Sequence, residues 1–165
     1  MSERTEPWYV HENGDGFRLA ELAVHALIAR KGVDVRVLDL RGRSDVTDYF
    51  VIASGQSDTQ VDALGRGVGD DLTEAGHKPM HREGFANSKW ILLDYVDVVV
   101  HVMQARTREY YGLERLWNDA GRLDVDELYF ERPDVAERHP DLPLVKRGLT
   151  AGNGTASDNS TEEDS

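Results

Sequence analysis

The chain of 165 residues contains no cysteine, so disulfide bonds, thiolate catalysis and cysteine-based zinc sites are all excluded. It is also poor in basic residues, because 31 Asp and Glu stand against 19 Lys and Arg, for a net charge of −12. Proteins that are held mainly by nucleic-acid phosphates need clustered Lys and Arg. The charge balance therefore argues against direct, sequence-specific nucleic-acid binding and favours a partner with a basic surface.

Long apolar segments are missing as well. No apolar run approaches the roughly 20 residues that a membrane-spanning helix needs. Residues 1–7 lack the apolar stretch behind a basic start that marks a secretory signal. We therefore expect a soluble, cytoplasmic protein that makes no membrane contact.

Composition divides the chain into four segments, of which one has the pattern of a folded domain. Residues 17–120 carry nearly all the periodic apolar pattern, and a polar extension, residues 1–16, precedes them. Residues 121–150 form an acidic extension that contains proline. Residues 151–165 have no large apolar side chain, so we expect a disordered acidic tail.

Apolar periodicity predicts alternating helices and strands within the domain. Ser57 lies three residues before Gln60, which is the spacing of a helix-capping box. An α/β fold, with a mixed β-sheet and helices on its faces, fits the predicted order. That order is helix 19–27, strands 33–40 and 49–53, helix 57–76, a short strand at 79–81, a hairpin of strands 90–93 and 98–102, and a closing helix 110–117.

Two glycine-containing segments only partly match phosphate-binding loops. Gly65, Gly67 and Gly69 lie within a predicted helix and not directly after a strand, so close helix packing explains them better. The turn at Ser54–Ser57 does lie between a strand and a helix, but no Lys follows it. Because Ser57 is placed to cap the helix, we favour an ordinary turn there over a nucleotide site.

Candidates for acid–base or metal chemistry are equally incomplete. Asp45 and Asp48 precede a strand, while Asp94 and Asp97 flank the hairpin turn, where Asp is favoured for its local hydrogen bonds. The six histidines show no metal-ligand spacing, and no serine stands in a Gly-x-Ser-x-Gly turn. His101 interrupts a strand of valines, so its side chain needs a hydrogen-bond partner or an interface. The sequence predicts a protein that is not an enzyme and that uses no cofactor or metal.

Aromatic residues gather in the last part of the predicted domain. Tyr110, Leu113 and Trp117 share one face of the closing helix, which predicts that Tyr110 and Trp117 pack inward. Tyr111 and Glu114 would then point elsewhere. A concentration of Trp and Tyr with charged residues among them is typical of a protein interface.

Five motifs within residues 17–120 are similar to those of the ribosomal silencing factor (Iojap-like) family. Each is short, but together their order and spacing are highly specific. They are Ser44-Asp-Val-Thr-Asp-Tyr-Phe-Val-Ile-Ala-Ser-Gly55, Glu83-Gly84, Trp90-Ile-Leu-Leu-Asp-Tyr95, Asp97-Val-Val-Val-His-Val102 and Arg108-Glu-Tyr-Tyr-Gly-Leu-Glu-Arg-Leu-Trp117.

The resemblance implies a regulator whose topology is similar to that of nucleotidyltransferases but lacks their active site. It implies binding to the large ribosomal subunit through ribosomal protein L-fourteen, which blocks joining of the small subunit and represses translation. Family members are often homodimers when free, so a homodimer is expected. In the implied surface, aromatic side chains supply buried area, and Asp94 and Glu114 meet cationic side chains. The residues assigned to that surface are Trp90, Asp94, Tyr95, His101, Arg108, Tyr111, Glu114 and Trp117.

The chain departs from the family's pattern at two positions. Val96 stands inside the hairpin turn where the family usually has Gly, and a β-branched residue resists a positive φ. The turn is therefore either strained or of another type. Gly112 replaces a common polar residue and is expected to loosen the start of the closing helix.

Two alternatives remain open. A large-subunit assembly factor would use the same surface as a silencing factor. A nucleotide-binding, nucleotidyltransferase-like protein would use the Ser54–Ser57 turn, and the missing pair of catalytic carboxylates argues against it.

Overall fold

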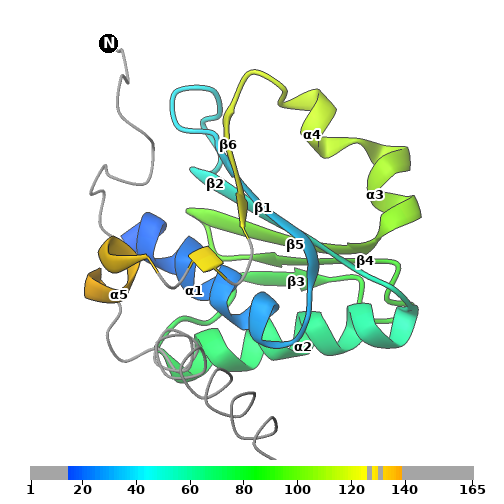
Figure 1. The fold of residues 1–165 in the computed structure, drawn as a ribbon. Coiled ribbons are helices and arrows are strands. Elements are labelled where there is room, and N and C mark those ends of the chain that lie inside the picture. The colour runs from blue at the N-terminus through cyan, green and yellow to red at the C-terminus, as the bar shows by residue number, and fades with distance from the viewer. Residues whose placement is uncertain (1–14, 126–127, 130–131, 139–165) are drawn as a thin grey trace, which may run out of the picture. The chain divides into compact units, whose positions relative to one another are not determined.

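The computed structural model describes residues 15–125, 128–129 and 132–138, and the chain divides into two compact units, residues 1–124 and 125–165 (Figure 1). The expectations for the N-terminal extension before residue 15 and for the acidic tail lie outside the described residues. No helix in the described part of the chain is long and apolar enough to span a bilayer.

The first unit is built on one mixed six-stranded sheet, with the strand order β3-β4-β5-β2-β1-β6. Strands β2 and β5 run parallel, whereas β1–β2, β3–β4 and β4–β5 are antiparallel pairs. This confirms the predicted α/β class and the predicted hairpin. The strands are β1 (Val33–Asp39), β2 (Tyr49–Gly55), β3 (His81–Glu83), β4 (Trp90–Asp94), β5 (Val98–Gln104) and β6 (Gly121–Val125).

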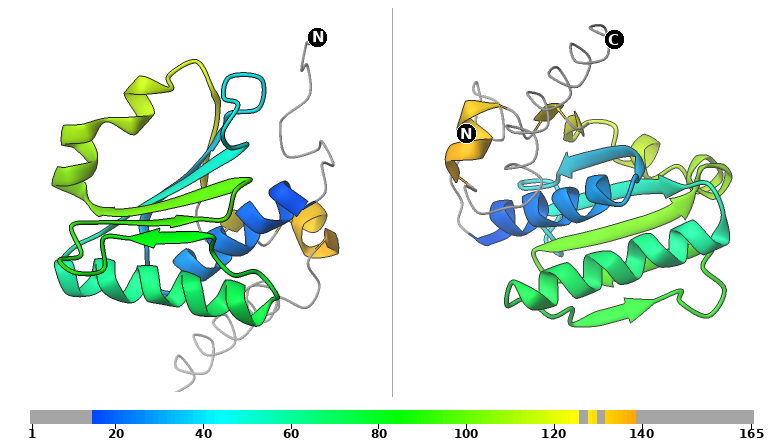
Figure 2. Two further views of the ribbon diagram at one scale, coloured as in Figure 1. Left: turned by 180° about the vertical axis from the view of Figure 1, so that it is seen from behind. Right: turned by 60° about the horizontal axis from the view of Figure 1, so that its bottom comes forward.

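Two long helices, α1 (Asp15–Ala29) and α2 (Asp58–Glu74), cover one face of the sheet (Figure 2). The Gln60 amide donates to Ser57 Oγ at 3.1 Å, so the predicted N-cap of α2 is confirmed. A Cβ on Gly65 would lie 2.9 Å from Ile91, which means that α2 approaches the sheet too closely for a side chain there. Close packing, as predicted, explains this mid-helix glycine.

The opposite face of the sheet, here called the open face, is defined by strand register. Directly paired residues point to the same side. Two short helices, α3 (Ala105–Tyr111) and α4 (Leu113–Leu116), lie away from α1 and α2 (Figure 1), and Leu113 packs against this face. The register places three rows there: Leu38, Phe50, Val99 and Asp94; Arg36, Ile52, His101 and Leu92; and Ser54, Met103 and Trp90.

The prediction of a single closing helix is wrong, because the segment forms two helices that are separated by Gly112. This residue has φ +58° and ψ +48°, a left-handed conformation that ends α3, and its N–H donates to the Arg108 carbonyl at 2.9 Å. The break rotates the two halves of the apolar stripe apart. Leu113 and Trp117 pack on the core, but Tyr110 is 76% exposed and does not point inward.

The second unit is described in part. It holds α5 (Pro133–Arg138), which begins at a proline, a residue favoured in the first helical turn. The guanidinium carbon of Arg132 lies 4.9 Å from the centre of the Tyr129 ring, a cation–π distance. The predicted proline-containing extension therefore includes ordered structure in the residues that are described.

Candidate partner-binding surface

Aromatic rings form a continuous row across the open face and onto α3. The distances between adjacent ring centres are 6.3 Å, 4.5 Å, 5.9 Å, 4.8 Å and 4.9 Å. Such spacings are favourable for tilted and edge-to-face contacts, so neighbouring rings hold one another in place. In spatial order, this aromatic row consists of Trp117, Phe50, His101, Trp90, Tyr111 and Tyr110.

His101 lies at the centre of the row and is only 4% exposed. Trp90 Nε1 donates to His101 Nδ1 at 3.1 Å, so the neutral ring carries its proton on Nε2. That Nε2 has no hydrogen-bond partner among the described residues. Burial lowers the pKa of His101 to about 4, because the surrounding rings do not solvate a charge. His101 therefore supports the row from within as an uncharged side chain.

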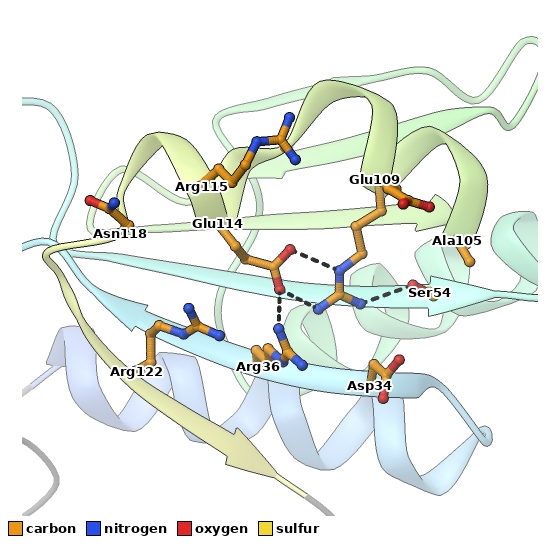
Figure 3. A pocket seen from close by; sticks show the side chains of 11 residues that line it. Asp34, Arg36, Ser54, Ala105, Glu109, Glu114, Arg115, Asn118 and Arg122 are labelled. Carbon is orange, nitrogen blue, oxygen red and sulfur yellow. Dashed lines mark hydrogen bonds and ion pairs between the residues drawn. The ribbon is translucent and has the colours of Figure 1, made fainter.

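The α3–α4 segment is tied to the open face by an ion-pair network centred on Glu114 (Figure 3). Arg108 donates from Nη2 to Glu114 Oε2 at 2.8 Å and from Nε to Oε1 at 3.2 Å. Its Nη1 donates to Ser54 Oγ at 2.9 Å, and Arg36 Nη1 donates to Glu114 Oε2 at 2.9 Å. We call these four side chains the clamp. Helix α3 is thereby fixed to strand β2 through Ser54, and helix α4 is fixed to strand β1 through Arg36.

Burial of the clamp changes the roles that the sequence predicts for Arg108 and Glu114. The Arg108 side chain is 8% exposed and that of Glu114 is 16% exposed. Burial alone would raise the pKa of Glu114, but the hydrogen bonds and charges of Arg108 and Arg36 outweigh it and hold the pKa below its usual value. Glu114 does not point away from the core, and the cations that it meets belong to its own chain.

Asp94 and Tyr95 lie at the far end of β4, at the hairpin turn. Asp94 shares the open face with Leu92 and pairs in register with His81 on the edge strand β3. Tyr95 is 8% exposed, and burial raises its pKa to about 12 despite the opposing charge of Arg82. Asp94 is thus available beside the row, whereas Tyr95 belongs to the interior.

The hairpin turn is strained at Val96. The Asp97 amide donates to the Tyr95 carbonyl at 2.9 Å, which closes a three-residue turn around Val96 at φ +77°. The Val96 amide is held by Asp94 Oδ1 at 2.8 Å. The strained form of the turn, one of the two that the sequence left open, is therefore the one adopted. It orients the Asp94 carboxylate through the backbone.

Replacing Val96 with Gly should stabilise the protein by about 1 kcal/mol, because Gly adopts a positive φ without the steric cost that a β-branched side chain carries. Little packing is lost, since Val96 is 49% exposed. Urea unfolding should give a higher midpoint at an unchanged m-value. The control is Val96→Ala, which retains a Cβ. An equal gain in that variant would contradict the assignment of the effect to φ.

The described residues offer little support for a metal-binding site or a nucleotide-binding site. No group of three or more His, Asp or Glu could hold a metal there. Asp48 and Asp97 do come near each other, and burial followed by the Asp97 charge raises the pKa of Asp48. At the turn considered for nucleotide binding, Ser54 Oγ accepts from Arg108 and Ser57 caps α2. Both hydroxyl groups are engaged within the protein.

The structure thus sorts the eight residues assigned from the sequence into three groups. Trp90, His101, Tyr111 and Trp117 join the aromatic row, Arg108 and Glu114 form the clamp, and Asp94 and Tyr95 lie at the turn. Sequence reasoning missed two members of the row, Phe50 and Tyr110. Phe50 could have been found from the alternation of β2, because it points to the face opposite its buried neighbours. Tyr110 could not, since its exposure depends on the break at Gly112.

Comparisons with known proteins agree with this architecture. A family model described as ribosomal silencing factor during starvation matches residues 15–144. A ribosomal silencing factor of Bacillus subtilis is 42% identical over 108 residues, which cover 66% of this chain and 92% of the relative. The chloroplastic protein Iojap of Zea mays is 31% identical over 98 residues, covering 58% of this chain and 41% of that protein.

Solved structures show the same likeness. A crystal structure of a Chromobacterium violaceum protein has a TM-score of 0.62 at 38% identity, covering 63% of this chain and 87% of that one. A crystal structure of a Bacillus halodurans protein has a TM-score of 0.58 at 35% identity, covering 66% of this chain and 98% of that one.

Proposed function

The chain belongs to the ribosomal silencing factor family, and from this premise we propose that it binds the large ribosomal subunit through ribosomal protein L-fourteen and blocks joining of the small subunit. Membership in this family supports a ribosome-associated silencing role for the protein. The protein partner, the steric block, the cytoplasmic location and a homodimeric free form are the finer parts of the proposal.

The observation that carries the proposal is the exposed end of the aromatic row. Tyr110 and Tyr111 are 76% and 56% exposed, and Trp90 beside them is half-buried. Exposed Tyr and Trp side chains on a rigid support are typical anchors of protein interfaces. The clamp supplies that support, so Tyr111 is presented in one orientation against the Trp90 ring.

Charge beside the row favours a basic partner. Asp94 lies on the open face, and Glu83 shares that face on the neighbouring strand β3, where it pairs in register with Leu92. The whole chain carries −12, so a basic ribosomal protein would be attracted over a distance of several ångströms. In the proposed complex, Asp94 and Glu83 meet Lys or Arg side chains at the rim, and the rings supply the buried area.

Sedimentation of purified large subunits with the protein tests the proposal. The protein should travel with the large subunit and prevent the joined ribosome from forming when small subunits are added. Tyr111→Ala should weaken this binding by about 30-fold or more, as expected for an interface anchor. A matched control is Phe85→Leu, which removes an aromatic ring on the α2 side of the sheet.

Asp94→Lys should reduce the affinity more at low salt than at high salt. A charge at the rim of an interface acts mainly through electrostatic attraction, and dissolved salt screens that attraction. Full co-sedimentation and normal silencing by the Tyr111→Ala variant would contradict the assigned surface. Subunits that join normally in the presence of the bound wild-type protein would contradict the silencing mechanism and favour an assembly role.

A further inference from the structure

A pocket of about 410 Å³ lies between the α3–α4 segment and strands β1 and β6, on the side of the clamp away from α1 and α2 (Figure 3). Its volume lies within the usual range for small-molecule sites. The side chains of the clamp line the middle of the pocket. Glu114 pairs with both Arg36 and Arg108, and Asp124 also pairs with Arg36 at 2.9 Å, so these two cations are compensated by two carboxylates and the charges that remain for a ligand are those around them.

Unpaired charges of opposite sign line the two ends of this pocket. Asp34 on β1 and Glu109 on α3 stand at one end, and Arg115 on α4 and Arg122 on β6 stand at the other (Figure 3). In the described part of the chain, the side chains of these four residues make no ion pair or hydrogen bond with another residue. The Asn118 amide adds a polar group at the basic end.

The backbone at the acidic end of the pocket is conformationally strained. The pairing of β1 with β2 shifts register between Val33 and Arg36, and Asp34 adopts φ +51° within that irregularity. A bulge of this kind re-aims a side chain, and here the re-aimed carboxylate lines the pocket. Strained backbone persists where it serves a site more often than elsewhere.

From this arrangement we propose that the pocket binds a small zwitterion that carries an ammonium group and a carboxylate, of the size of a free amino acid or a dipeptide. The ammonium group meets Asp34 and Glu109, and the carboxylate meets Arg115 and Arg122. The ammonium group and the carboxylate of one ligand then both form charge-assisted hydrogen bonds. The clamp between them lies under the middle of the ligand.

Two other ligand classes fit the same pocket less well. A nucleotide or inorganic phosphate could meet Arg115 and Arg122, but it would bring no cation to Asp34 and Glu109 at the other end. A neutral sugar would leave the unpaired charges at both ends without partners, which costs free energy when water is displaced from them. A zwitterion matches both ends and adds no net charge.

Calorimetric titration and amide chemical-shift mapping of the purified full-length chain test this without ribosomes, so the outcome is independent of the proposed silencing role. The probes are L-alanine, L-leucine and L-alanyl-L-alanine. At least one should bind saturably below about 10 mM and shift amides around the pocket. N-acetyl-L-alanine, which lacks the ammonium group, and L-alaninamide, which lacks the carboxylate, should bind at least about tenfold more weakly.

Two variants assign each end of the ligand. Asp34→Asn, which tolerates the left-handed backbone, should weaken alanine binding about tenfold and leave N-acetyl-L-alanine unaffected. Arg122→Gln should weaken alanine binding and leave L-alaninamide unaffected. Arg18→Gln, on α1 outside the pocket, is the control for loss of a charge. Should Asp34→Asn fold poorly, Glu109→Gln tests the same end.

Three results would overturn the proposal. The first is that none of the three zwitterions binds with a dissociation constant below about 10 mM. The second is that N-acetyl-L-alanine binds as well as L-alanine, because the pocket would then recognise an anion alone. The third is that ATP or inorganic phosphate binds more tightly than every zwitterion.

Discussion

Arg108→Met should lower the free energy of unfolding by about 2–3 kcal/mol, because it removes the main partner of a mostly buried carboxylate. Three hydrogen bonds from Arg108 are lost, two to Glu114 and one to Ser54. Removing one member of a buried ion pair typically costs about 3–5 kcal/mol. The cost is smaller here because Glu114 retains Arg36 at 2.9 Å.

The conservative replacement and a matched control locate the cause of this effect. Arg108→Lys keeps the charge but cannot form the three bonds of the planar guanidinium, so about half of the loss should remain. Arg106→Met, two residues earlier on the same helix, removes an exposed Arg and should change stability by less than about 0.5 kcal/mol. Equal losses in the Arg106 and Arg108 variants, measured by urea unfolding, would contradict the clamp.

The same variant should also weaken binding to the large subunit, although Arg108 itself is buried. The clamp fixes the segment that carries Tyr111, and a loosened segment must be ordered again at the interface, which reduces affinity. Such an effect distinguishes a positioning residue from a contact residue. In Arg108→Met, adding Tyr111→Ala should then cost less binding than it does in the wild-type protein.

Acid should destabilise the protein through His101. The pKa of His101 is about 4 in the folded protein against its ordinary value of 6.5, so the unfolded chain takes up a proton first as pH falls. The stability contribution of the neutral ring is therefore fully present above pH 6.5 and is lost as pH falls towards 4. The loss amounts to about 2 kcal/mol at pH 5 and about 3 kcal/mol at pH 4.

His101→Gln isolates this effect from the titration of carboxylates. Gln can accept the Trp90 hydrogen bond at neutral pH but takes up no proton. The stability difference between wild type and variant should shrink by about 2 kcal/mol between pH 7.5 and pH 5, as measured by urea unfolding at each pH. A pH-independent difference would show that the His101 ring titrates normally in the folded state.

Local patterns in the sequence determined most of the elements. The alternation of Val35 and Val37, the apolar run before Gly55 and the cap at Ser57 are each read from a few neighbouring residues. Strand pleat, helix period and capping act over such short distances. The α/β class with a mixed sheet follows from their order, and five short motifs in one order sufficed for the family resemblance.

Only the tertiary structure decided how those elements share a surface. Strand register places Phe50, His101 and Trp90 beside one another, although 51 positions separate Phe50 from His101. Glu114 meets Arg36, which is 78 residues away, and so belongs to the clamp. Such contacts depend on sheet order and on the left-handed turn at Gly112, which local periodicity does not report. The sequence therefore determined which residue types were available, and long-range packing decided which of them are anchors and which hold the anchors in place.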